Sequence, residues 1–300
     1  FTDCIRGEVS FENKLIDDQV LLKSDGFPTY HLGVVVDDHI MEISHIFRGE
    51  EWISSTPKHI LLYSFFGWEP PVIGHLSVLR NPDKSKLSKR KNPVWVGDYR
   101  KQGFLPEAIR NYLGTMGWSY PGGKDIFSTQ EMIDAFNIAD VQTTAPVFDR
   151  EKLRWVSGEY FRSMDDAAIQ SGILAFYPQY ETKKDLVAQI VPLIRNRMKI
   201  LSEFESLAGF FFAAPMVYER RPNAEYIHSM KTVISVSSMA HDELEQKLRA
   251  AAEKIQVKPK DYFMDLRLAI TGKTVGPPLL ESMAILGKEE CVKRLEKACS

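Results

Sequence analysis

Residues 72–91 read VIGHLSVLRNPDKSKLSKRK, an apolar strand-like run that leads directly into a strongly basic loop. The loop opens with Asn81-Pro82-Asp83, which is typical of a turn because proline fixes φ and its polar neighbours bond to nearby backbone. Five cations then follow within residues 84–91, broken by two serines and a leucine. Such a loop repels itself and is stabilised by an anion. A solvated surface loop, a nuclear-localisation signal or a nucleic-acid patch would carry the same charges.

The composition is that of an ordinary globular chain. Its 300 residues are 44% apolar and 26% charged, with a formal net charge of −2, so any RNA contact must come from local basic patches. Three scattered cysteines predict no disulfide framework and favour a reducing cytosol. No apolar run approaches the roughly 18 residues of a membrane span. The chain opens at Phe1 in the middle of a pattern, and we expect a fragment of a longer protein.

Short strands and helices alternate over the first 97 residues. Strands are expected at residues 8–12, 19–23, 43–47 (buried) and 72–79. Helices are expected at residues 29–41, capped near Thr29, and from Thr56-Pro57 to Gly67, with an apolar face of Ile60, Leu61 and Phe65. A strand–helix–strand unit predicts a parallel α/β sheet, whose ligands bind beyond the carboxyl ends of the strands. Arg48 and the basic loop both follow strands there.

Helical periodicity replaces this alternation further along the chain. Helices are expected at residues 106–116, 129–136 with Thr129 as cap, 149–160, 183–208, 240–255, 260–269 and 288–298. Domain boundaries are expected near residues 97 and 165.

Two other patterns could carry chemistry. Five of the seven histidines fall between residues 31 and 75, and Asp37-Asp38-His39 could bind a metal, but hydrogen-bonded core histidines are favoured because no thiols or second paired motif accompany them. We therefore predict no metal site. Residues 271–274, TGKT, lack the earlier glycine and the preceding strand of a phosphate loop.

The basic loop contains Lys86-Leu87-Ser88-Lys89-Arg90, which resembles the Lys-Met-Ser-Lys-Ser signature of class I aminoacyl-tRNA synthetases in the form typical of glutamyl-tRNA synthetases. Further similar segments occur along the chain in the family's order: residues 22–32, 35–39, 47–52 with 55–57, 63–68, 111–114 with 117–118, 148–155, 266–267 with 271–272, and 286–289. The resemblance covers essentially the whole chain.

This resemblance implies an α/β fold followed by an all-α fold. Residues 1–97 would form the second half of a Rossmann-type catalytic domain, with the tail of the connective insertion at 1–26. Residues 98–165 would form a stem-contact domain, and residues 166–300 an α-helical anticodon-binding domain.

The resemblance also implies a site for amino-acid activation, in which negative charge builds on the phosphate oxygens of ATP and cations stabilise it. Lys86 and Lys89 would be catalytic. The implied ATP contacts are Glu51, Trp52, Leu79, Lys86, Leu87, Ser88, Lys89 and Arg90. Glutamate would be held by Tyr30 and Arg48, since a guanidinium can bind a carboxylate with two parallel bonds. Val34 departs from the asparagine that some members place there.

Basic residues downstream would bind tRNA(Glu). The implied contacts are Arg100, Lys101 and Arg110 for the stem, and Arg195 and Arg197 for the anticodon. Arg197 matches the arginine that reads the third anticodon base in discriminating members, work suited to a planar guanidinium.

The expected activity is ATP-dependent ligation of L-glutamate to tRNA(Glu) through a glutamyl-adenylate, with ATP and Mg²⁺, by a monomeric cytoplasmic enzyme without membrane contact; an organelle remains open. No His-x-Gly-His motif occurs in the sequence, so we expect this chain alone not to activate glutamate. The alternatives are a tRNA-binding module without catalysis, a non-discriminating enzyme that also charges tRNA(Gln), and an α/β scaffold with a helical partner-binding tail.

Overall fold

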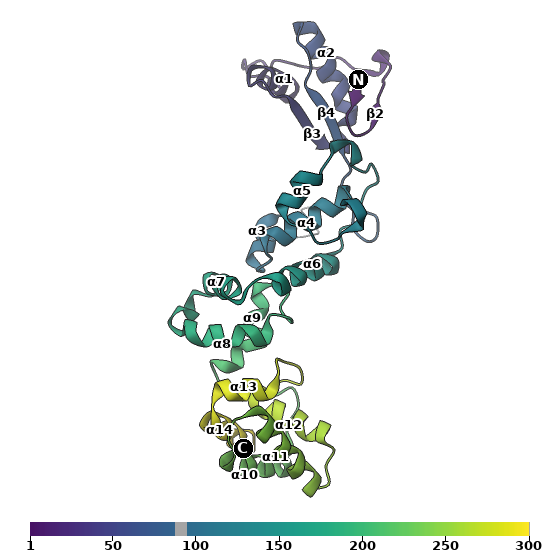
Figure 1. Cartoon of the computed structure of the whole chain (residues 1–300). Coiled ribbons are helices and arrows are strands. Elements are labelled where there is room, and N and C mark those ends of the chain that lie inside the picture. Colours follow the sequence, from purple (N-terminus) through teal and green to yellow (C-terminus); the bar gives the residue numbers. More distant parts are fainter. Residues whose placement is uncertain (88–94, 300) are drawn as a thin grey trace. The chain divides into compact units, whose positions relative to one another are not determined.

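The computed structural model describes residues 1–87 and 95–299. The chain forms two compact units, one made of Phe1–Val96 with Pro106–Val156 and the other of Gly97–Leu105 with Ser157–Ser300 (Figure 1). Each unit has its own apolar core, and the candidate site for small substrates lies in the first.

A four-stranded sheet organises the first unit. Its strands are β1 (Thr2–Asp3), β2 (Gly7–Glu8), β3 (His45–Gly49) and β4 (Val72–Leu76), in the order β2-β1-β4-β3. β3 and β4 pair in parallel along their whole length, and α2 (Thr56–Phe66) connects them. The predicted parallel strand–helix–strand unit is confirmed, and both strands end at the same edge of the sheet.

The helices beside the sheet begin and end at residues whose chemistry explains the boundaries. α1 (Tyr30–Ile40) starts after Thr29, as predicted, although the Thr29 hydroxyl donates to the carbonyl of Val20 instead of capping the helix. α2 has proline in its first turn and ends at Gly67, whose φ of 69° is readily adopted by glycine. A 3₁₀ helix, η2 (Glu50–Ser55), joins β3 to α2.

Some expectations for this unit are wrong. Residues 8–12 and 19–23 do not form the expected strands; apart from Glu8 at the end of β2, only an isolated bridge between Leu22 and Pro28 remains. The strand expected to be buried, β3, has only exposed and half-buried residues because it is an edge strand of the sheet. α2 buries Leu62 and Tyr63, and Phe65 is 78% exposed. α2 is apolar on nearly every side, so sequence periodicity does not reveal the buried face.

Residues 106–156 contribute further helices to the first unit. α4 (Pro106–Gly117), α5 (Thr129–Ala135) and the start of α6 (Arg150–Ser163) occur where they were predicted. The cap of α5 is Ser128 instead of Thr129, because Ser128 exchanges side-chain and backbone hydrogen bonds with Glu131.

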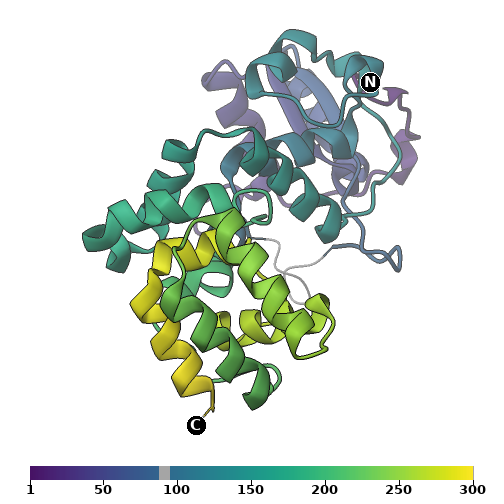
Figure 2. The same cartoon turned by 60° about the horizontal axis from the view of Figure 1, so that its bottom comes forward.

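The second unit contains two helical cores. One involves the end of α6, α7 (Asp166–Phe176), α8 (Lys184–Ile194) and α9 (Phe204–Ala208). The other combines α10 (Ala224–Val236), α11 (His241–Lys254), α12 (Pro259–Thr271), α13 (Leu279–Leu286) and α14 (Lys288–Cys299), which Figure 2 shows as a green and yellow bundle. A short helix, α3 (Val96–Lys101), also enters this unit.

The helix expected at residues 183–208 is broken. α8 ends at Ile194, and a turn follows it before α9. The Glu203 carboxylate accepts hydrogen bonds from the backbone of Lys199 and Ile200, which stabilises the non-helical connection. The Gly103 carbonyl meets the Leu201 amide at 2.9 Å in the same region. Across the described residues, no helix is both long and apolar enough to cross a membrane.

Candidate functional site

The carboxyl ends of β3 and β4 bring together an arginine and two aromatic rings. Arg48 lies near the end of β3, Trp52 on η2 and Tyr30 at the start of α1. The Arg48 Cζ atom is 5.8 Å from the centre of the Tyr30 ring and 5.3 Å from the centre of the Trp52 ring. Both distances suit cation–π contact. The two rings are themselves 5.3 Å apart, and Tyr30 is 52% exposed. The guanidinium is thus held by aromatic rings at a surface that a solute can reach.

Two histidines form a hydrogen-bonded chain behind this guanidinium. The Arg48 Nη1 atom lies 3.5 Å from His59 Nδ1, and His59 Nε2 lies 2.9 Å from His31 Nδ1. Burial, with the nearby charges of Arg48, His31 and Lys58, lowers the pKa of His59 to about 4. Burial, together with Lys58 and Arg48, also lowers the pKa of His31. Hence both imidazoles are neutral at neutral pH.

A small cavity lies beside Arg48 and His59, both of which line it. Asp38 and Tyr63 contribute to its lining. Burial raises the pKa of Asp38, while Arg48 acts in the opposite direction. The Tyr63 hydroxyl is buried and has no hydrogen-bond partner among the described residues. Burial likewise raises the pKa of Tyr63.

The described part of the basic loop reaches the same strand ends through an ion pair. The Lys86 Nζ atom is 2.8 Å from a Glu51 carboxylate oxygen, and this hydrogen bond lowers the pKa of Glu51. The carbonyl of Leu79 accepts from the amide of Leu87 at 3.0 Å, which closes the base of the loop. The remaining predicted ATP contacts, Ser88, Lys89 and Arg90, lie outside the described residues.

A buried polar network supports the turn that carries Trp52. The Asp3 carboxylate is 2.6 Å from His75 Nδ1, and His75 Nε2 is 3.1 Å from the Thr56 hydroxyl. That hydroxyl lies 3.1 Å from the Trp52 carbonyl. Burial acts to raise the pKa of Asp3, but the hydrogen bonds from His75 and the backbone lower it overall. The network ties the N-terminal strand to the turn beside the site.

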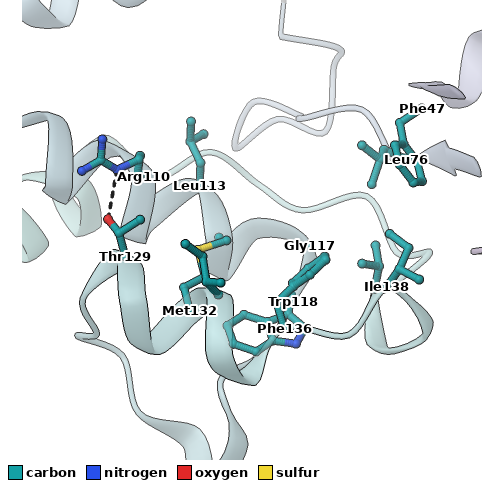
Figure 3. Close-up of a pocket in the computed structure, with 13 residues that line it drawn as sticks. Phe47, Leu76, Arg110, Leu113, Gly117, Trp118, Thr129, Met132, Phe136 and Ile138 are labelled. Atoms are coloured by element: carbon teal, nitrogen blue, oxygen red, sulfur yellow. Dashed lines mark hydrogen bonds between the residues drawn. The ribbon is translucent and has the colours of Figure 1, made fainter. Parts of the chain in front are cut away.

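An apolar pocket of about 770 Å³ also lies in the first unit (Figure 3). It is lined mainly by apolar side chains, among them Leu113, Trp118 and Met132. Arg110, a predicted tRNA contact, is at this pocket and donates to the Thr129 hydroxyl at 3.2 Å. Tyr30, Arg48, Trp52 and Lys86 do not line it. Because charged substrates need polar partners, we place the candidate site at Arg48 and not in this pocket.

The predicted tRNA contacts are dispersed. Arg100 and Lys101 are exposed on α3 in the second unit, whereas Arg110 belongs to the first. Arg195 donates to Asp166 at 3.0 Å and to the Arg162 carbonyl at 2.6 Å, which ties α8 to neighbouring helices. Arg197 is exposed, but both arginines lie after the end of α8, not inside a helix as expected. Arg267 is half-buried, and its pKa is lowered by burial and then by the positive charge of Arg197, while Glu281 acts in the opposite direction.

Sequence reasoning missed several residues around Arg48. His31, His59, Asp38 and Tyr63 were not proposed as site residues, and neither was Arg267. The clustering of histidines between residues 31 and 75 was the available signal. Its interpretation as hydrogen-bonded packing is confirmed for His31, His59 and His75. His39 instead stacks on Trp68, with ring centres 3.8 Å apart.

The chain is similar to known proteins along its whole length. Residues 1–155 match the family described as tRNA synthetases class I (E and Q), catalytic domain, and residues 166–299 match an anticodon binding domain. A glutamate–tRNA ligase of Acinetobacter baumannii (strain AYE) is 42% identical over 99% of this chain and 61% of its own length. One of Acidothermus cellulolyticus is 42% identical over 100% of this chain and 63% of its own length.

The chain is also similar to two solved structures of glutamate–tRNA ligases. The glutamate tRNA ligase of Elizabethkingia meningosepticum, solved in complex with its amino acid, has a TM-score of 0.85 at 32% identity. The glutamate–tRNA synthetase of Elizabethkingia anophelis has a TM-score of 0.81, also at 32% identity. Each match covers 100% of this chain and 65% of the other, so the chain spans less than two thirds of the length of these relatives. The expected fold class, a class I catalytic domain followed by a helical anticodon-binding domain, is confirmed, and the chain belongs to the class I tRNA synthetases of the E and Q type.

Proposed function

We propose that this chain is the glutamate- and tRNA-binding part of a glutamate–tRNA ligase. The observation that carries the proposal is the Arg48 guanidinium held against the Tyr30 and Trp52 rings at the strand ends. A guanidinium presents paired N–H donors that match a carboxylate, so Arg48 would bind the side-chain carboxylate of L-glutamate and discriminate against glutamine. Tyr30 would cover the bound amino acid.

ATP would bind beside this pocket. Lys86, released from Glu51, would neutralise charge on the phosphates, together with Lys89. Trp52, Glu51 and the Leu79 backbone would surround the ribose and adenine, and Leu87, Ser88 and Arg90 would complete the loop over the nucleotide. Mg²⁺ would arrive bound to the phosphates, which are its usual partners in such reactions. In an enzyme that also has the His-x-Gly-His segment, the α-carboxylate of glutamate would then attack the α-phosphate, forming glutamyl-adenylate and expelling pyrophosphate.

The second half of the chain would present tRNA(Glu). Arg197 is exposed, so its guanidinium can contact an RNA. Arg100, Lys101 and Arg110 would contribute phosphate contacts to the stem, and Arg195 would lie with Arg197 at the anticodon. We propose a monomer that acts in the cytoplasm. Because the sequence contains no His-x-Gly-His motif, the chain alone would bind substrates without activating glutamate.

The proposal is tested by calorimetric titration of the chain with L-glutamate. We expect saturable binding that Arg48→Met abolishes, because the carboxylate loses its charged partner. Arg249→Met is the matched control, since Arg249 pairs with Glu245 in the second unit. Equal binding by wild type and Arg48→Met would refute the role of Arg48. Filter binding of tRNA(Glu), with Arg197→Gln for comparison, tests the second half separately.

A further inference from the structure

The hydrogen bonds behind Arg48 determine which nitrogens carry protons. A guanidinium is always charged and donates from every nitrogen, so the atom facing it must be an acceptor. His59 Nδ1, 3.5 Å from Arg48 Nη1, is therefore unprotonated. A neutral imidazole carries its proton on the other nitrogen. His59 Nε2 then donates to His31 Nδ1 at 2.9 Å, and His31 in turn carries its proton on Nε2.

The surroundings favour this arrangement over a charged one. His59 is 6% exposed, and Arg48 and Lys58 both place positive charge near it. The Tyr30 ring packs on both imidazoles, with centres 5.6 Å from His31 and 6.5 Å from His59. A proton on His59 Nδ1 would direct two donors at each other and place an imidazolium beside a guanidinium. The hydrogen bonds therefore run in one direction, with Arg48 donating to His59 and His59 donating to His31.

We infer that His59 is a positioning residue, which holds the Arg48 guanidinium by accepting its hydrogen bond, and that His31 fixes the tautomer of His59. With one edge bonded to His59 and the rings of Tyr30 and Trp52 alongside, Arg48 keeps its other donors for a ligand. The inference deepens the proposed function, on which its relevance to glutamate rests. The positioning itself depends only on contacts within the protein.

Two substitutions of His59 distinguish its role as a hydrogen-bond acceptor for Arg48 from a role in packing alone. In His59→Asn, the amide oxygen can occupy the place of Nδ1 and still accept from Arg48. In His59→Gln, the amide reaches the place of Nε2, toward His31, and leaves Arg48 without its acceptor. We expect phenylglyoxal to modify Arg48 at the wild-type rate in His59→Asn and about two- to tenfold faster in His59→Gln, the effect of one lost hydrogen bond. Peptide mass spectrometry gives the rate, with Arg249 as internal reference.

Equal rates in all three proteins, or equal acceleration in both variants, would overturn the inference. A measurement on the unmodified sequence removes any dependence on the folding of variants. Long-range ¹H–¹⁵N spectra at neutral pH should show both His31 and His59 as the Nε2–H tautomer. A proton on His59 Nδ1 would likewise overturn the assignment.

The two proposals fail in different ways. If glutamate does not protect Arg48 from phenylglyoxal, the proposed binding role is wrong, whereas the effect of the His59 variants remains. If the variants behave alike while glutamate still protects Arg48, the positioning role is wrong and the binding role stands.

Discussion

Acidification should destabilise the first unit through His59. The pKa of His59 is about 4 in the folded chain and 6.5 for an ordinary imidazole. Between these values the unfolded chain binds a proton that the folded chain excludes. Stability contributed by the neutral ring is therefore complete above about pH 6.5 and is lost as the pH falls toward 4.

The magnitude follows from the two pKa values. A difference of about 2.5 units corresponds to about 3 kcal/mol when the transition is complete. Between pH 7 and pH 5 the loss is about 2 kcal/mol by the same linkage relation. Burial sets this value first, followed by the charges of Arg48, His31 and Lys58. Asp38 lines the same cavity as His59.

Tryptophan fluorescence isolates the unit concerned. The five tryptophans are at positions 52, 68, 95, 118 and 155, all within the first unit. Urea unfolding followed by their emission at pH 7 and pH 5 gives the free energy of unfolding of that unit. His59→Asn is the control because it keeps an acceptor toward Arg48 but does not titrate.

We expect the wild type to lose about 2 kcal/mol more than His59→Asn between the two pH values. His31 and the carboxylates titrate in both proteins and cancel in the comparison. The same loss in both proteins would show that His59 protonates freely in the folded chain, which would refute the reasoning.

Three further results are expected. Gln256 has a φ of 56° after the end of α11, so Gln256→Gly should stabilise the second unit by about 0.5–1 kcal/mol in thermal unfolding followed by circular dichroism. Gly103→Ala should destabilise that unit by about 2–4 kcal/mol, because the φ of Gly103 is 79° and the added Cβ would lie 2.6 Å from the Cβ of Leu201. Gly209→Ala is the control and should be tolerated, since a Cβ there would meet no atom within 4 Å. Lys86→Met should raise the pKa of Glu51 in a ¹³C NMR titration, since the hydrogen bond that lowers it is removed; an unchanged titration would contradict the ion pair.

The sequence predicted those helices whose ends are marked by a single proline or glycine. A proline in the first turn and a glycine after the last turn predicted both ends of α2. A proline and a glycine also mark the two ends of α4. The parallel unit placed Arg48 and Trp52 at a common edge, because parallel strands end together. The roles of these residues in binding glutamate and ATP remain predictions.

Tertiary contacts decided what local patterns could not. β1 is two residues long, too short for an alternation of apolar residues, and it is held by Asp3 bonding to a histidine 72 positions away. The pairing of His31 with His59 depends on the rotation of α1 and α2 about their axes. The sequence does not specify that rotation, since α2 is apolar around its circumference. The break after α8 likewise depends on Glu203 reaching back to backbone amides.

Asp3 is buried and bonds to His75, although Thr2 next to it is exposed. In Asp3→Ala, the buried imidazole of His75 and the backbone amides of Ile5 and Arg6 would lose the carboxylate that bonds to them. Leaving such groups unsatisfied costs about 1–3 kcal/mol. A chain without this carboxylate should therefore hold the Trp52 turn less firmly.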